Sequence, residues 1–211
     1  MSRKRKPSGR GKGYKSRQVR NRPLLQRFLI VCEGEKTEPV YFDGFRIPSV
    51  YIETLGLGKD PLELVEHAQS MRSKNRYDQV WCVFDKDDVL PDRFNQALAL
   101  AKRHAIKVAY SNQAFELWYL LHFHYCDVAL ARRDYIDGLT HQLGRPYEKN
   151  DRILYQELLS KQDHALHNAE RLLEQYSPTN PAVDDPSTTV FQLVQELNRF
   201  VKNKRFSKGN S

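Results

Sequence analysis

The chain has 211 residues, a formal net charge of +8 and three cysteines, a size that suits one domain with an appendage and that buries a core without disulfide bonds. No apolar run approaches the roughly 20 residues of a membrane-spanning helix, and no apolar segment follows the basic N-terminus, so we expect neither a membrane protein nor a secreted one. No cysteine has a Cys-x-x-Cys partner. Buried free thiols in a cytoplasmic protein are therefore expected at Cys32, Cys82 and Cys126.

The charge is divided unevenly along the chain. Residues 1–27 hold eleven Lys/Arg and residues 199–211 hold five, with no acidic residue in either stretch, so all 26 acidic residues lie within 28–198. A basic stretch rich in Gly and Ser cannot form a core, so we expect a disordered arm over 1–26 and a basic tail over 202–211. Such an arm suits contact with nucleic acid, although a solubilising tail fits the same composition. The candidate phosphate-binding residues of the arm are Arg3, Lys4, Arg5, Lys6, Arg10 and Lys12.

Short apolar runs alternate with helical patterns in the first two thirds of the chain. Continuous apolar or β-branched runs predict buried strands over 27–32, 50–55, 79–84 and 107–110. The segments between and after them are helical in pattern or composition and predict helices over 38–45, 61–73, 92–104 and 114–123. Thr37 and Asp60 are the predicted N-caps of the first two helices. This alternation predicts an α/β fold in which helices sandwich a parallel sheet.

The pattern changes near residue 130, after which we expect only helices. These are predicted over 134–143, 153–160, 165–176 and 188–201. Residues 177–187 contain three prolines and are expected to form a connector. The predicted organisation is thus an α/β core over 27–128 and an all-helical extension over 129–201 that packs on this core.

Two of the predicted strands are followed by acidic residues. Glu33 follows the strand at 27–32, and Asp85 follows the strand at 79–84, with Asp87 two residues later. Parallel sheets bind ligands at the carboxyl ends of their strands, and an extended backbone would point Asp85 and Asp87 the same way. Converging carboxylates repel one another unless a cation lies among them, and oxygen ligands suit Mg²⁺ or Mn²⁺. Helix caps or solvated loop positions are the alternative reading of the same acids.

Two groups of motifs resemble known families. The sequence C-E-G-E-K-T-E over Cys32–Glu38, with F-D-K-D over Phe84–Asp87, resembles the Toprim domain, in which a glutamate follows the first strand and D-x-D follows a later one. The run S-N-Q-A-F-E-L-W-Y-L-L-H-F over Ser111–Phe123, with N-P and S-T-T-V further on, more specifically resembles RloB-type proteins. These are relatives of the overcoming-lysogenization-defect nucleases.

The resemblance covers residues 27–201 and implies a Toprim-like sheet that binds Mg²⁺ through Glu33, Asp85 and Asp87. It also implies an Mg²⁺-dependent nuclease in a prokaryotic anti-phage or restriction-linked system, acting with an ABC-type ATPase partner. Many family members have a proline where this chain has Gln113. The turn into the helix that follows is therefore expected to differ here.

Further polar residues lie in or near these motifs. Glu116 is surrounded by apolar residues, where an unpaired carboxylate is costly, so we expect a fourth metal ligand or one half of an ion pair. Glu38 fits the first turn of a helix or a second metal site. His122 fits a core histidine better than a catalytic base. Lys36 and Lys86 lie beside the acids and are candidates to bind phosphate, or else serve as local counter-charges.

Other charged residues are expected to be structural. Arg132 and Arg133 are predicted to lie in a solvated helix start. His164 and His167 have helical spacing but no third ligand nearby, which argues against zinc.

The favoured function is cleavage of phosphodiesters in DNA or RNA, including tRNA, with Glu33 binding the metal or acting as general base. The alternative is a non-catalytic nucleic-acid-binding or sensor subunit that regulates an ATPase. Whether the chain forms a homo-oligomer stays open.

Overall fold

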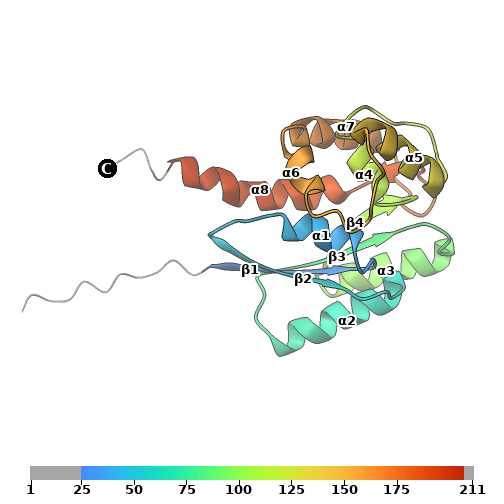
Figure 1. The fold of residues 1–211 in the computed structure, drawn as a ribbon. Helices are drawn as coiled ribbons and strands as arrows, with labels where there is room; N and C mark the ends of the chain where they lie inside the picture. Colours follow the sequence, from blue (N-terminus) through green and yellow to red (C-terminus); the bar gives the residue numbers. More distant parts are fainter. Residues whose placement is uncertain (1–24, 207–211) are drawn as a thin grey trace, which may run out of the picture.

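The computed structural model describes residues 25–206, with side chains described as far as Val201. A five-stranded sheet in the order β2-β1-β3-β4-β5 runs through the middle of the structure (Figure 1). The strands are β1 (Gln26–Cys32), β2 (Val50–Gly56), β3 (Gln79–Asp85), β4 (Lys107–Asn112) and β5 (Ser187–Thr188). The first four are parallel to one another. The predicted α/β fold is confirmed.

The interior strand β1 is buried on both faces because it lies between two parallel neighbours and two helical layers. Phe28, Ile30 and Cys32 point into one core, and Leu29 and Val31 into the other, all at 0% exposure. Successive side chains of a strand point to opposite faces, so a strand covered on both sides must be apolar throughout. This is why the sequence shows a continuous apolar run here instead of an alternating one.

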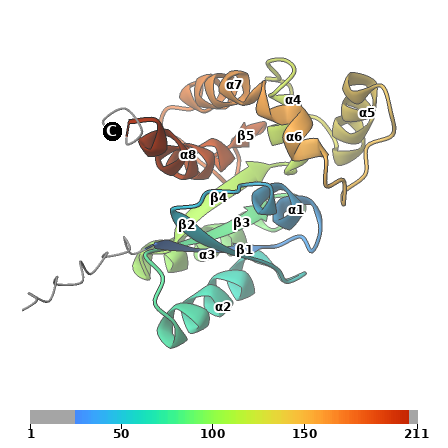
Figure 2. The same ribbon diagram turned by 60° about the vertical axis from the view of Figure 1, so that its left-hand side comes forward.

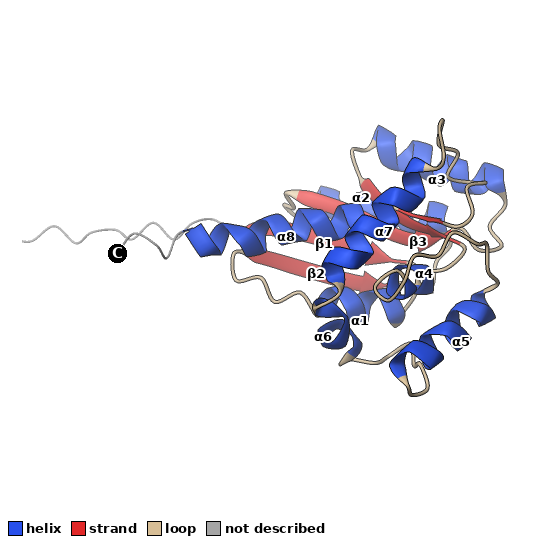
Figure 3. Cartoon of the chain, turned by 90° about the horizontal axis from the view of Figure 1, so that it is seen from above, coloured by secondary structure: helices blue, strands red, loops and turns tan. Residues whose placement is uncertain are grey.

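Helices cover both faces of the sheet (Figures 1 and 2). One face packs against α2 (Pro61–Lys74) and α3 (Pro91–Arg103). The other faces a larger core to which the remaining helices contribute: α1 (Thr37–Asp43), α4 (Glu116–Leu120), α5 (Arg132–Leu143), α6 (Leu154–Leu159), α7 (Gln162–Glu174) and α8 (Val190–Phe206). Seen from above, α8 lies over the sheet and runs roughly along β1 and β2 (Figure 3), and its Phe200 packs edge-to-face on Phe28, with ring centroids 5.6 Å apart.

The short strand β5 is a difference from the prediction, which gave no strand after residue 130. It pairs antiparallel with β4, so the sheet is mixed and not purely parallel. Polar side chains hold it there: the hydroxyls of Ser111 and Thr188 lie 3.0 Å apart, and the backbone N–H of Tyr110 donates to Thr189 Oγ1 at 2.9 Å. Two residues are too few to show the alternating pattern of a strand. Both are polar, and their buried hydroxyls are hydrogen-bonded, so no apolar run marks the strand in the sequence. Hydropathy therefore could not predict β5.

The observed starts of α1 and α2 can be compared with the two predicted N-caps. Thr37 is wrong as an N-cap, because it lies inside α1 and the capping position, Lys36, makes no side-chain capping bond. Asp60 is confirmed, since its Oδ1 accepts the backbone N–H groups of Leu62 at 3.0 Å and Glu63 at 3.3 Å. The predicted helix over 114–123 is shorter as observed, with α4 limited to Glu116–Leu120.

The three cysteines are buried and free, as predicted. Among the helices of residues 25–206, none combines the length and the apolar character that crossing a membrane requires. The predicted arm lies outside the described residues as far as residue 24, and the predicted tail overlaps the end of α8 before it leaves them at residue 207.

Replacing Asp60 by Ala should lower the free energy of unfolding by about 1 kcal/mol, because two N–H groups at the start of α2 lose their acceptor. Chemical denaturation measures this. Asp60→Asn is the matched control: it keeps an acceptor but weakens the exposed pair with Arg93 at 2.8 Å, and exposed pairs contribute about 1 kcal/mol or less. Equal losses in both variants would show that the ion pair, and not the cap, carries the stabilisation.

Candidate functional site

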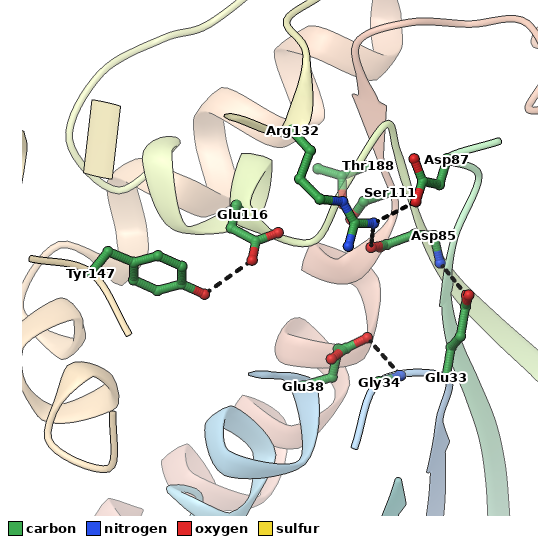
Figure 4. A network of polar contacts seen from close by, with 10 residues as sticks. All are labelled: Glu33, Gly34, Glu38, Asp85, Asp87, Ser111, Glu116, Arg132, Tyr147 and Thr188. Carbon is green, nitrogen blue, oxygen red and sulfur yellow. Dashed lines mark hydrogen bonds and ion pairs between the residues drawn. The ribbon is translucent and has the colours of Figure 1, made fainter. Parts of the chain in front are cut away.

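Two acidic residues meet at the carboxyl ends of neighbouring strands. Glu33 directly follows β1, and Asp85 is the last residue of β3. The register pairs Cys32 with Val83, which brings the two strand ends to the same edge. There the backbone N–H of Asp85 donates to Glu33 Oε2 at 3.0 Å (Figure 4). The structure therefore brings together the two residues that the sequence placed at this edge.

Asp87 joins this pair by a different route from the predicted one. The strand ends at Asp85, and Asp87 has φ of 35°, in the left-handed region and not in an extended backbone. Aspartate tolerates this conformation better than most residues. The turn nevertheless brings the carboxylates of Asp85 and Asp87 to one common partner, as Figure 4 shows.

That partner is Arg132, the first residue of α5. Its Nη2 lies 3.1 Å from Asp85 Oδ2 and 2.9 Å from Asp87 Oδ2. The prediction of a solvated position is wrong for Arg132, but it holds for Arg133, whose side chain is 89% exposed and pairs only loosely with Asp137 at 3.8 Å. The sequence around Arg132 gave no indication of this contact, because its partners Asp85 and Asp87 lie more than 40 residues earlier in the chain.

Two further carboxylates face the same space. Glu38 lies in the first turn of α1, and its Oε1 accepts the N–H of Gly34 at 3.2 Å. Glu116 begins α4 and is 2% exposed. The hydroxyl of Tyr147 donates to Glu116 Oε1 at 3.1 Å, and among the described side chains Glu116 has no ion-pair partner (Figure 4). The predicted need for a partner is met by a phenol, and a role as metal ligand stays open.

The loop between α5 and α6 carries Tyr147 to this position and brings Lys149 to the rim. Two contacts fix the loop: the N–H of Tyr147 donates to Thr140 Oγ1 at 3.2 Å, and Arg145 pairs with Glu157 at 2.8 Å. Lys149 is exposed and lines the same cavity as the acids. Sequence reasoning missed it, because a lysine in a polar loop is unremarkable until the loop is placed.

The cavity enclosed by these residues has a volume of about 300 Å³. Six carboxylates line it against three cationic side chains. The carboxylates are Glu33, Glu35, Glu38, Asp85, Asp87 and Glu116, and the cations are Lys36, Arg132 and Lys149. The excess of acidic groups means that the cavity favours a cation or the protonated forms of its acids.

The pKa values of the acids reflect this excess. Burial raises the pKa of Glu33 from its ordinary 4.5 to about 7, and the nearby Glu38 adds to the shift. The pKa values of Asp85 and Glu38 are also raised, first by burial and then by other carboxylates, including Glu116. Arg132 lowers the pKa of each of these three groups, so it is the cation that opposes their protonation.

The remaining predicted residues are placed as follows. Lys36 lines the cavity, whereas Lys86 does not and instead donates to the carbonyl of Asp87 at 3.3 Å. His122 is a buried core residue with Nδ1 2.9 Å from the carbonyl of Trp118, and burial lowers its pKa to about 4. The basic residues predicted to bind phosphate in the arm lie outside the described residues: Arg3, Lys4, Arg5, Lys6, Arg10 and Lys12.

The donor set fits a hard divalent cation by its chemistry, because all the acidic ligands are carboxylate oxygens in an open cavity. Within residues 25–206, no three His, Cys, Asp or Glu side chains are grouped so as to hold a metal ion. At Asp85 and Asp87 the converging oxygens contact the guanidinium of Arg132.

The fold and site define an α/β protein with an acidic cavity at the carboxyl ends of two parallel strands, where the side chain of Arg132 pairs with Asp85 and Asp87. A family model described as RloB-like protein matches residues 28–197, and the chain belongs to this family. Comparison with curated proteins gave no match, and comparison with solved structures gave none either. The resemblance to RloB-like proteins that the sequence motifs indicated is thus confirmed.

The raised pKa of Glu33 predicts a pH dependence for the metal-free protein. Folding favours the protonated carboxyl, so its stabilising contribution is complete below pH 4.5 and is lost as the pH rises to about 7. Glu33→Gln cannot ionise but still offers an acceptor to Asp85. Thermal midpoints in the presence of a chelator should therefore fall relative to this variant across that interval. A constant difference between the two proteins would show that Glu33 titrates elsewhere.

Proposed function

We propose that this protein is an Mg²⁺-dependent nuclease of the Toprim kind that hydrolyses phosphodiester bonds. The observation that carries the proposal is the convergence of Glu33, Asp85 and Asp87 at one edge of a parallel sheet, beside an open cavity. Carboxylates in this position serve to hold divalent ions that act on phosphates. Membership of the RloB-like family supports the same reading.

In this proposal Glu33, Asp85 and Asp87 hold Mg²⁺, with Mn²⁺ as an alternative ion, and Glu116 completes the ligand set from the opposite wall. The bound ion would polarise the phosphate and neutralise charge on the leaving oxygen. Glu38 lies between these two walls and is the remaining carboxylate for a second ion.

The hydrolysis itself needs a proton acceptor. The oxygen of water forms a bond to phosphorus, the bond to the leaving nucleotide oxygen breaks, and one proton leaves the water. Where it does not bind the metal, Glu33 suits this task, because burial raises its pKa to about 7 in the metal-free protein and a carboxylate with that pKa can take up a proton at neutral pH. The backbone N–H of Asp85 donates to Oε2 of Glu33, and the other carboxylate oxygen of Glu33 has no hydrogen-bond partner among the described residues.

The cationic residues at the rim of the cavity suit a particular class of substrate. Lys36 and Lys149 are exposed at the cavity and suit phosphate oxygens, which carry no sequence information. The basic arm would gather nucleic acid in the same sequence-independent way. DNA and RNA, including tRNA, both fit. The family resemblance supports a setting in prokaryotic anti-phage or restriction-linked defence with an ABC-type ATPase partner.

Asp85→Asn and Asp87→Asn should each lower Mg²⁺-dependent cleavage more than about 100-fold, because even outer-shell partners of metal sites contribute 10- to 100-fold. The assay follows end-labelled single-stranded DNA, duplex DNA and tRNA, with a chelator as the metal-free reference. Asp92→Asn removes the same charge from an exposed position in the first turn of α3 and should leave the rate unchanged. Wild-type rates in both site variants would rule out this assignment.

One observation favours a second function. Asp85 and Asp87 are paired with Arg132, and within the described residues they are not grouped with a third acidic side chain so as to hold a metal ion. This arrangement also fits a non-catalytic subunit that binds nucleic acid or senses a state of an ATPase. Turnover separates the two: a protein that binds nucleic acid but cuts none of the substrates, with Mg²⁺ or Mn²⁺ and with its partner present, is the non-catalytic subunit.

A further inference from the structure

Arg132 lies at a helix position that disfavours it. It is the first residue of α5, where the helix dipole is positive and a cationic side chain is destabilising. The helix gains nothing from an arginine there, and the neighbouring Arg133 already supplies an exposed charge for solubility. The position of Arg132 is thus explained by its contacts across the cavity, not by the stability of α5.

The contacts of Arg132 use only part of its hydrogen-bonding capacity. Both aspartates approach the same nitrogen, Nη2, whereas the Nε–H is buried without a hydrogen-bond partner. A guanidinium has five N–H donors in a planar fork that matches two oxygens of a carboxylate or phosphate. Arg132 therefore sits between the two aspartates without engaging either one through its fork. The fork suits a further anion better than the contact it makes now.

The position of Nη2 is also the position that a metal ion would need. Asp85 Oδ2 and Asp87 Oδ2 converge on it from 3.1 and 2.9 Å. An Mg²⁺ ion bound to the same two oxygens lies at about 2.0–2.1 Å from each. The two cations would overlap and repel, so the guanidinium and the metal exclude one another. The side chain of Arg132 is 35% exposed and has room to move aside.

We infer that Arg132 is a further catalytic residue, which occupies the metal position in the resting protein and binds the scissile phosphate once a divalent cation displaces it. This inference rests on the proposed nuclease function for its second half only. The first half, competition between guanidinium and metal, concerns binding alone. It predicts that the resting protein binds metal more weakly than its carboxylates permit, because only the fraction of molecules with Arg132 moved aside is competent.

The first experiment measures metal binding without nucleic acid. Titration calorimetry with Mn²⁺ should show about tenfold tighter binding to Arg132→Ala than to the wild-type protein. Lys149→Ala is the matched control, since it removes a cavity cation that contacts neither aspartate, and its effect should be much smaller. Arg132→Lys keeps the charge and reports whether the fork, rather than the charge, matters. Circular dichroism checks that each variant is folded.

The second experiment measures the phosphate contact. In Ca²⁺, which suits binding without turnover, Arg132→Ala should bind a phosphorothioate oligonucleotide about tenfold more weakly than wild type does, although it binds metal more tightly. Its cleavage in Mg²⁺ should fall about 100-fold or more, the loss that removal of one transition-state donor produces. Tighter metal binding together with slower cleavage is a combination that a merely structural ion pair does not give.

The outcomes separate the two proposals. Unchanged or weaker Mn²⁺ binding by folded Arg132→Ala overturns the competition, and unchanged oligonucleotide binding overturns the phosphate contact. If Mn²⁺ binding tightens and oligonucleotide binding weakens but even the wild-type protein with its partner present cleaves nothing, Arg132 keeps its binding roles, and the nuclease function fails.

Discussion

Repulsion among buried carboxylates is the constraint around which this cavity is built. Asp85 and Glu116 are nearly inaccessible, and Glu33 lies within hydrogen-bonding distance of the Asp85 backbone. Charges of one sign in such a place persist only with a cation among them or with protons on the acids. In the structure described here the cation is Arg132. The same constraint is what supports the proposed binding of a divalent ion.

The sheet supplies the rigid side of the cavity. Glu33 and Asp85 are held at the ends of β1 and β3, whose side chains are buried on both faces. Ser111 lies opposite Asp85 in the register of β4, and its hydroxyl contacts Thr188 of β5. The short β5 thus ties the far end of the chain to the strand beside the acids. Hydrogen bonds buried in this way hold the strand ends in one position.

The C-terminal half supplies the other side. Glu116, Arg132 and Lys149 come from α4, from α5 and from the loop after α5. The hydrogen bond from Tyr147 to Glu116 joins this loop to α4. The helices after residue 130 are therefore part of the site as well as cover for the sheet. Movement of α5 or its loop relative to the strands would change the charge balance of the cavity, whereas the sheet itself need not move.

The sequence by itself determined the features that depend on near neighbours. The apolar run before Glu33 and the one before Asp85 each predicted a strand, and parallel strands that end together place their acids at one edge. Asp60 was recognisable as a cap because its partners are two and three residues away. The family was recognisable because its motifs are contiguous.

Only the tertiary structure decided the features that depend on distant partners. Arg132 lies 47 residues from Asp85, and its own surroundings in the sequence suggest a solvated helix start. Thr188 reaches Ser111 across 77 residues, in a strand too short to have a period. Ion pairs and hydrogen bonds between side chains depend on positions in space, which hydropathy and local propensity do not encode. The acids of the cavity could thus be predicted, but the cation that balances them could not.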